Sequence, residues 1–177
     1  MLLEDELALV VRAQNGDRTA LGELWDFITP KLHGYLVNTV RNPQLAEDLL
    51  QNTWLKAITA IHKFQPKGVR FSAWLFAIAR NECRQHWRDH GQETSIEEAD
   101  LEKIPETMTT HEKISEKIFL DTELNKLPEE HREILRLRYI SEFSFKEIAQ
   151  ILSISTIAAR VRVHRALGQM RTNLEKY

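Results

Sequence analysis

The fold of this 177-residue chain is decided by one stretch, SFKEIAQILSISTIAARVRVHRALGQM, which covers residues 144–170. Ser144 and Glu147 have the spacing of a capping box, in which each side chain binds the other residue's backbone amide at the start of a helix. After a short break, Ser155 is placed to cap a second helix. Two short helices joined by a three- or four-residue turn form a helix-turn-helix, so we predict that motif here.

The second of these helices has two different faces. An apolar stripe recurs at spacings of four, three and four residues and would face the protein core: Ala159, Val163, Ala166 and Met170. Basic side chains occupy the other faces, and arginine suits both phosphate groups and guanine edges in the major groove. The pattern favours DNA binding over the alternative of a plain helical hairpin with a solvated basic face.

Charge is distributed unevenly along the chain. The formal net charge of −2 by itself argues against a nucleic-acid partner. Residues 131–177, however, carry nine Lys or Arg and four Asp or Glu, whereas residues 89–130 carry four and thirteen. An acidic middle segment therefore masks a basic C-terminal segment, and this asymmetry is a better guide to partners than the total.

Composition narrows the class of protein. Gly and Pro are scarce, which favours helices over a turn-rich β-fold. Cys83 is the only cysteine, which excludes a disulfide framework and fits a reducing cytoplasm. No apolar run is long enough to span a bilayer, and the acidic N-terminus is unlike a signal peptide.

Helical periodicity runs through residues 1–90. We predict five helices: one up to Gln14, one that ends before Pro30, one from Pro30 to Asn42, one from Pro43 to about His62 and one from Phe71 to about Asp89. Gly16 and Asp17 would separate the first two helices, residues 66–68 would form a loop, and Ser72 would open the fifth helix.

Residues 91–112 are acidic and poor in large apolar side chains, so we predict a flexible linker there. Further helices are expected from His111 to Pro128 and from Glu129 to Ile140. The predicted fold is all-α: a helical domain over residues 1–90, the acidic linker, and a four-helix domain over residues 113–177 that contains the helix-turn-helix.

Three segments resemble the bacterial sigma factors, in the order in which that family has them. AEDLLQNTW (residues 46–54) and FSAWLFAIARN (residues 71–81) resemble the helices that bind core RNA polymerase and read the −10 element. Leu127-Pro128 together with Glu147-Ile148-Ala149 resembles the C-terminal domain of the family. The absence of further domains resembles the small extracytoplasmic-function (ECF) group, and only the linker is unmatched.

The resemblance implies three sets of contact residues. Docking on core polymerase would use Glu47, Asp48, Leu49, Gln51, Asn52 and Trp54. Binding and opening of the −10 element would use Lys63, Lys67, Arg70, Arg80, Asn81, Arg84 and Arg88. Reading of the −35 element would use Ser155, Thr156, Arg160, Arg162, His164 and Arg165.

Opening DNA needs a pocket for an unstacked base and cations for the backbone. Aromatic surface near the predicted −10 residues comes from Phe64, Trp74 and Trp87. For Trp74 we favour packing in the core, and for Trp87 both roles stay open.

The resemblance also implies partners. They would be core RNA polymerase (its clamp helices and flap), promoter DNA and an anti-sigma factor, which can hold such a protein at the inner face of the membrane. The chain would be a cytoplasmic, non-catalytic specificity subunit, monomeric when free of partners and weak in its affinity for free DNA. No catalytic residue, cofactor, bound metal or small-molecule substrate is expected.

The chain departs from the family pattern in the helix-turn-helix itself. Ser153 stands where family members often have Gly, and a positive φ is easiest for Gly. Residues 157–159 are Ile-Ala-Ala where many members have Gly-Thr-Val, so the core at Ala159 would be thinner. We expect these changes to affect which upstream sequence is read.

Other functions remain open from the sequence. The chain could be a stand-alone regulator that dimerises on a palindromic site, or an interaction module without DNA binding. Cys83, His86 and His90 share one helix face and would ligate zinc only with a fourth ligand, so a metal site is the weaker interpretation. Cys83 would be a redox sensor only with a lowered pKa.

Overall fold

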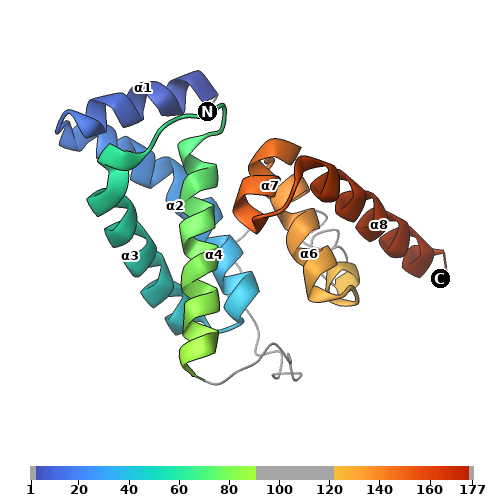
Figure 1. Ribbon diagram of the computed structural model, residues 1–177. Coiled ribbons are helices and arrows are strands. Elements are labelled where there is room, and N and C mark those ends of the chain that lie inside the picture. Colours follow the sequence, from blue (N-terminus) through green and yellow to red (C-terminus); the bar gives the residue numbers. More distant parts are fainter. Residues whose placement is uncertain (1–2, 91–121, 176–177) are drawn as a thin grey trace, which may run out of the picture.

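A computed structural model describes residues 3–90 and 122–175, and every regular element in those ranges is helical (Figure 1). The all-α fold class is therefore confirmed. The N-terminal lobe, residues 3–90, contains α1 (Leu3–Gln14), α2 (Arg18–Val40), α3 (Pro43–Ala60), the 3-10 turn η1 (Ile61–Lys63) and α4 (Phe71–Asp89). The C-terminal lobe, residues 122–175, contains α6 (Glu129–Leu135), the π-helical turn η2 (Arg136–Ile140), α7 (Phe145–Leu152) and α8 (Thr156–Leu174). The predicted linker over residues 91–112 and most of the helix expected from His111 lie outside the described residues.

Helix α2 runs unbroken through Pro30 and corrects the prediction of two helices that meet there. Asp17 caps its start, because the Asp17 carboxylate accepts the backbone N–H of Thr19 at 2.9 Å and that of Ala20 at 3.1 Å. Pro30 removes one backbone donor from the helix interior. Since Pro30 lies on the exposed side, water can bind the carbonyl that loses its partner, and the helix continues.

Helices α3 and α4 confirm the predicted ranges, but α4 starts differently from the prediction. It begins at Phe71 as predicted, but Ser72 does not cap it: the N-cap residue is Arg70, which makes no side-chain cap. Instead, the Glu6 carboxylate of α1 accepts the backbone N–H and the hydroxyl of Ser72, both at 2.9 Å. A carboxylate is favourable at the positive end of a helix dipole. Glu6 is only 1% exposed, and burial raises its pKa despite these bonds.

The helix-turn-helix is confirmed, together with both of its caps. Glu147 accepts the backbone N–H of Ser144 at 2.8 Å, and the Ser144 hydroxyl accepts that of Glu147 at 3.3 Å. The Ser155 hydroxyl caps α8 by accepting the backbone N–H of Ala158 at 3.1 Å. Ser153 ends α7 with a φ of 55°, in the left-handed region. The turn therefore has the geometry that suits Gly, at a cost for Ser of roughly 1–2 kcal/mol.

The helix predicted over Glu129–Ile140 is present, but its last five residues widen into η2. There the backbone N–H of Ser141 donates to the carbonyl of Arg136 at 2.9 Å, five residues back. The chain then turns and buries Phe143, which is 2% exposed. Phe143 packs edge to face against Phe76 of α4, with ring centroids 4.8 Å apart. The wide turn thus places an aromatic ring between the two lobes.

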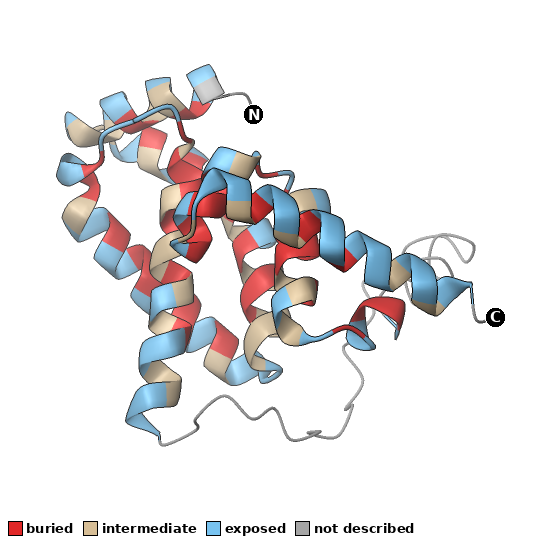
Figure 2. Cartoon of the chain, turned by 45° about the vertical axis from the view of Figure 1, so that its right-hand side comes forward, coloured by how far each residue is buried: buried red, intermediate tan, exposed pale blue. Residues whose placement is uncertain are grey.

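The buried apolar side chains of both lobes form one continuous core. Figure 2 shows buried residues on the sides of the helices that face one another and exposed residues along the outer side of α8. Helices α4 and α7 contact each other where the lobes meet. Through this contact, the C-terminal lobe packs on α4, the helix that carries four of the predicted −10 residues.

No helix in the described ranges is long and apolar enough to cross a bilayer.

Candidate nucleic-acid interface

An open cavity of about 270 Å³ lies beside the loop that joins η1 to α4. Its wall consists of residues from η1, this loop, α4 and α7: Lys63, Phe64, Gln65, Lys67, Val69, Trp74 and Gln150. The loop turns at Gly68, whose φ of 73° is a conformation that suits glycine. Lys146 of α7 approaches closely, since a Cβ atom on Gly68 would lie 2.5 Å from the Lys146 Nζ atom.

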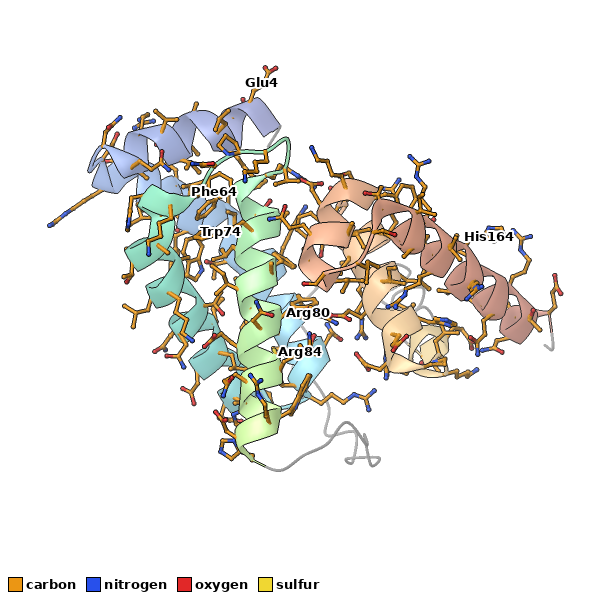
Figure 3. All side chains as sticks on the ribbon, in the orientation of Figure 1. Glu4, Phe64, Trp74, Arg80, Arg84 and His164 are labelled. Carbon is orange, nitrogen blue, oxygen red and sulfur yellow. The ribbon has the colours of Figure 1, made fainter. Side chains whose placement is uncertain are left out.

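Three aromatic rings cluster beside the cavity. The ring centroids of Phe64 and Trp74 are 5.4 Å apart, and Phe71 lies 5.4 Å from each (Figure 3). Trp74 is half-buried, so it packs against the core as expected and also lines the cavity. Trp87 packs partly buried against the core and does not line the cavity. An aromatic wall with nearby cations is the composition that an unstacked base requires.

Five of the seven residues predicted to contact the −10 element are exposed: Lys63, Lys67, Asn81, Arg84 and Arg88. Lys63 and Lys67 line the cavity, and the other three follow along α4, where Figure 3 shows Arg84. These three side chains therefore lie on the helix that also carries Trp74 of the cavity wall. The remaining two, Arg70 and Arg80, are engaged elsewhere.

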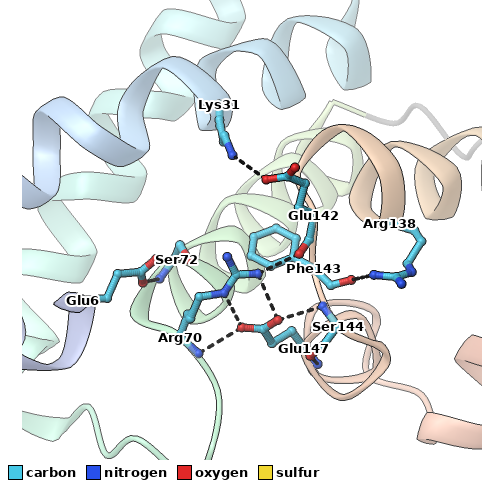
Figure 4. A network of polar contacts seen from close by, with 9 residues as sticks. All are labelled: Glu6, Lys31, Arg70, Ser72, Arg138, Glu142, Phe143, Ser144 and Glu147. Carbon is cyan, nitrogen blue, oxygen red and sulfur yellow. Dashed lines mark hydrogen bonds and ion pairs between the residues drawn. The ribbon is translucent and has the colours of Figure 1, made fainter. Parts of the chain in front are cut away.

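Arg70 is held by Glu147 of α7, as Figure 4 shows. Arg70 Nε donates to Glu147 Oε1 at 2.7 Å, Nη2 donates to Oε2 at 3.1 Å, and the Arg70 backbone N–H donates to Oε1 at 3.1 Å. Nη2 also donates to the Glu142 carbonyl at 3.0 Å, and the guanidinium lies 5.0 Å from the centroid of the Phe143 ring. The side chains of Arg70 and Glu147 are 19% and 6% exposed, so the pair is largely shielded from water.

Arg80 contacts the C-terminal lobe in the same way. Arg80 Nε donates to Glu133 Oε1 at 2.9 Å, and the hydroxyl of Tyr35 donates to the same oxygen at 2.8 Å. Tyr35 is buried, and burial raises its pKa well above the ordinary value, so the hydroxyl remains a donor. Glu133 thus ties α6 to both α2 and α4.

The surroundings of Glu147 favour its ionised form. Burial alone would raise the pKa of Glu147, but hydrogen bonds from Arg70 and Ser144 outweigh burial and hold the pKa below its ordinary value of 4.5. A carboxylate with a lowered pKa stabilises the folded state above pH 4.5, and that contribution is lost as the pH falls through the lowered value. The pair with Arg70 is therefore charged at neutral pH.

The outward side of α8 carries most of the residues predicted to read the −35 element. Five of them are exposed: Ser155, Thr156, Arg160, His164 and Arg165 (Figure 3 shows His164). No acidic residue occurs in α8. Arg162 lies 3.9 Å from Glu130 of α6, and the Ser155 hydroxyl is engaged in the helix cap. The part of α8 that is free to contact DNA is therefore narrower than predicted.

Two apolar residues on this outward side were not predicted as contacts. Ile157 is 76% exposed and Val161 is 42% exposed. They share the side of Arg160 and His164, because residues three or four apart face the same way on a helix. The sequence did hold a signal for them, namely two branched apolar residues four apart and outside the buried stripe. In a major groove, such side chains can contact thymine methyl groups.

The outward side of α3 carries only part of the predicted polymerase contact. Its exposed members are Glu47, Asp48, Gln51 and Asn52. Leu49 and Trp54 are 5% and 1% exposed, so the structure corrects their assignment: they fill the core and support the helix from within. Two exposed apolar residues of α3 were not predicted as contacts: Leu55, which is 65% exposed, and Ile58, which is 40% exposed.

Cys83, His86 and His90 do not come together as a metal site. Cys83 is fully buried, and burial raises the pKa of its thiol to about 12, so the reactive thiolate is not populated at neutral pH. The rings of His86 and His90 stack on each other, with centroids 4.1 Å apart. Within residues 3–90 and 122–175, no group of three or more His, Cys, Asp or Glu is placed to hold a metal ion.

Known proteins match both lobes. Residues 28–93 match the Sigma-70 region 2 family, and residues 120–170 match the Sigma-70 region 4 family. The RNA polymerase sigma factor CarQ of Myxococcus xanthus is 33% identical over 161 residues, which cover 90% of this chain and 92% of the relative. The ECF RNA polymerase sigma factor EcfG of Rhodopseudomonas palustris is 34% identical over 147 residues, which cover 80% of this chain and 77% of the relative.

A solved structure has a similar fold. It is a co-crystal of the sigma factor RpoE with the anti-sigma factor NepR from Bartonella quintana. Its similarity to this chain has a TM-score of 0.67 at 25% identity and covers 88% of this chain and 96% of that one. The segment matched to region 2 contains all the residues that line the cavity except Gln150, and the segment matched to region 4 contains Gln150 and the helix-turn-helix.

Proposed function

The chain belongs to the ECF family of RNA polymerase sigma factors, and on that premise we propose how its surfaces divide the recognition of a promoter. The N-terminal lobe opens the −10 element, α8 reads the −35 element, and the outward side of α3 docks on core polymerase. One observation carries this proposal. The N-terminal lobe supplies the cations and the aromatic rings of a cavity, and the C-terminal lobe carries a basic helix without acidic residues. Like the family, the chain does no covalent chemistry.

At the −10 element, the cavity receives one base of the opened strand. Trp74 and Phe64 offer it an aromatic wall, and stacking on an aromatic ring is worth about 1–3 kcal/mol per base. Lys63 and Lys67 bind the phosphates on either side of that base. The exposed cations along α4 then follow the strand, so opening is stabilised by contacts that duplex DNA cannot make.

At the −35 element, α8 enters the major groove with its first turns. Arg160 and His164 contact base edges there, and the backbone amides at the start of the helix face a phosphate. Ile157 and Val161 lie between these polar side chains and favour sites with thymine methyl groups. The absence of acidic residues from α8 means that nothing on this helix repels the DNA backbone.

Docking uses the exposed acidic and polar residues of α3 together with Leu55 and Ile58. Exposed apolar residues rimmed by polar ones are typical of protein interfaces. We also propose an anti-sigma partner, because the similar structure from Bartonella quintana contains one. Free of both partners, the chain would be a monomer in the cytoplasm.

Replacing Lys63 and Lys67 together by Ala tests the cavity. Initiation from a duplex promoter by the polymerase complex is expected to fall about tenfold, because two phosphate contacts of the opened strand are lost. On a template whose −10 region is already unpaired, initiation is expected to recover to within about threefold, since opening no longer has to be driven. Run-off transcription on both templates measures the difference. Equal losses on the two templates would contradict a role in strand opening.

A further inference from the structure

The loop that carries most of the cavity wall is held at both of its ends by α1. In Figure 1 this loop, residues 64–70, leads from η1 to α4 and runs along α1. We infer that Gln14 and Glu6 of α1 are positioning residues: they fix the two ends of the loop and thereby set how well the cavity discriminates between bases of the −10 strand. The inference rests on the proposed function, because it takes the base-binding role of the cavity from there.

Gln14 holds the start of the loop. Its side-chain Nε2 donates to two backbone carbonyls, that of Ile61 at 2.9 Å and that of Phe64 at 3.1 Å. These carbonyls lie at the end of η1, and the last carbonyls of a helical segment have no partner within it. An amide group supplies two N–H donors without adding a charge. Since Phe64 is part of the cavity wall, Gln14 fixes the backbone of the wall itself.

Glu6 holds the end of the loop in the complementary way. Its carboxylate accepts the backbone N–H and the hydroxyl of Ser72, in the first turn of α4 (Figure 4). The first N–H groups of a helix have no partner within it, so an acceptor is needed here where Gln14 supplies a donor. Glu6 is 1% exposed, so water does not compete for the contact. Two residues after Ser72, α4 presents Trp74, another ring of the cavity wall.

The two positioning residues share one side of the same helix. Glu6, Val10 and Gln14 are spaced four residues apart, and residues at this spacing face the same way on a helix. Val10, between the other two, is 1% exposed and belongs to the core. The eight residues from Glu6 to Gln14 rise about 12 Å along the helix axis. The two ends of the loop are therefore held at a fixed separation by a helix that is itself packed in place.

The middle of the loop has hydrogen bonds of shorter range. The backbone N–H of Lys67 donates to the carbonyl of Gln65 at 2.9 Å, only two residues back. A turn of this size sets the local conformation but not the place where the loop lies on the protein. Lys146 of α7 also donates to the carbonyl of Lys67. Gln14 and Glu6, in contrast, belong to the same lobe as the loop, so they hold it independently of the C-terminal lobe.

The variant Gln14→Glu tests the inference, because its carboxylate has nearly the same size but offers no donor to either carbonyl. Core polymerase with each variant selects templates from a promoter pool that is randomised at both the −10 and the −35 elements. We expect the preference for the best −10 base to fall about tenfold, since a displaced wall no longer fits that base closely. The preference at the −35 element should stay within about twofold of the wild type, because α8 is a separate site in the other lobe.

The matched control is Asn15→Asp, which makes the same change from amide to carboxylate at the adjacent, exposed residue. An added negative charge weakens binding to every DNA sequence alike, so we expect both base preferences of the control to equal those of the wild type. Gln14→Met removes the two donors without adding a charge. It is expected to lower the −10 preference about fivefold and to leave the −35 preference unchanged.

Glu6 is tested by a disruptive and a conservative variant. Glu6→Ala leaves the Ser72 amide without its acceptor, and we expect it to lower the −10 preference about tenfold. Glu6→Gln can still accept the Ser72 backbone N–H and donate to its hydroxyl, so it should keep that preference to within about twofold. A variant with only a folding defect would lose the −10 and −35 preferences together.

The selection separates the inference from the proposed function. A wild-type complex without any base preference at the −10 element would contradict the proposed function, whatever the variants do. A wild-type complex that reads a −10 base, with Gln14→Glu and Gln14→Met that read it equally well, would overturn the positioning role alone. Equal losses at both elements in these two variants would also overturn it, because they would show that Gln14 only stabilises the fold.

Discussion

Replacing Arg160 and His164 together by Ala is expected to reduce initiation from a −35-dependent promoter by roughly 100-fold. Both side chains are exposed on the outward side of α8, whose start is fixed by the Ser155 cap. A good base contact is worth about 1–3 kcal/mol, so the loss of two contacts amounts to about 3 kcal/mol. Run-off transcription with core polymerase measures the effect. Affinity for a duplex with only the −35 element should fall in parallel.

The matched control is Arg171→Ala, which removes an exposed cation from the last turn of the same helix. It is expected to stay within about threefold of the wild type, since it removes at most one phosphate contact. Arg160 also lies 5.5 Å from the Phe145 ring, so thermal unfolding of the double variant must be compared as well. Wild-type transcription from a stable double variant would favour an interaction module without DNA binding.

Uracil in place of promoter thymines would test the proposed contacts of Ile157 and Val161, because it removes only the methyl groups.

Replacing Trp54 by Ala is expected to lower the free energy of unfolding by about 3–5 kcal/mol. Its side chain is 1% exposed, its ring centroid lies 4.9 Å from that of Trp25, and its Nε1 donates to the Thr29 hydroxyl at 3.1 Å. Removing the indole leaves a cavity between α2 and α3. Denaturant unfolding measures the loss. The neighbouring Leu55→Ala should stay within about 0.5 kcal/mol of the wild type, because its side chain is 65% exposed.

The exposed Leu55 side chain is expected to matter for the binding of core polymerase rather than for stability. Leu55→Ala is expected to weaken binding about tenfold, as loss of an apolar interface anchor does. Leu174→Ala, which truncates another exposed leucine at the end of α8, should leave binding unchanged. If Leu55→Ala binds like the wild type, the outward side of α3 is not the docking surface. If Trp54→Ala keeps wild-type stability, its assignment to the core is wrong.

Local signals in the sequence predicted local structure well. The capping box at Ser144 and Glu147 and the helix start at Pro43 are settled by residues close in the chain, and the structure has both. Pro30 misled the prediction because the effect of a proline depends on which side of the helix it faces, and that side is set by tertiary packing. Ser153 adopts the left-handed turn despite its side chain, so the departure from Gly leaves the motif intact.

The site was harder to predict than the fold. Residue type and order identified the segments that hold the cavity and the recognition helix. They could not show that Arg70 pairs with Glu147, 77 residues away, or that Arg80 pairs with Glu133, 53 residues away. Such pairs depend on how two lobes pack, which no local pattern encodes. The resemblance likewise identified α3 as the helix that docks on core polymerase, but it did not show which of its residues face outward. Trp54 and Leu55 are adjacent in the chain, yet Trp54 is buried and Leu55 is exposed.

We propose that the chain recognises and opens a promoter only together with core polymerase. Strand opening at the −10 element tests it most directly, measured as permanganate reactivity of unpaired thymines on a promoter selected from a randomised pool. We expect no opening and only weak duplex binding by the chain alone, and opening once core polymerase is added. Tight, sequence-specific duplex binding by the isolated chain, with no opening after polymerase is added, would contradict it.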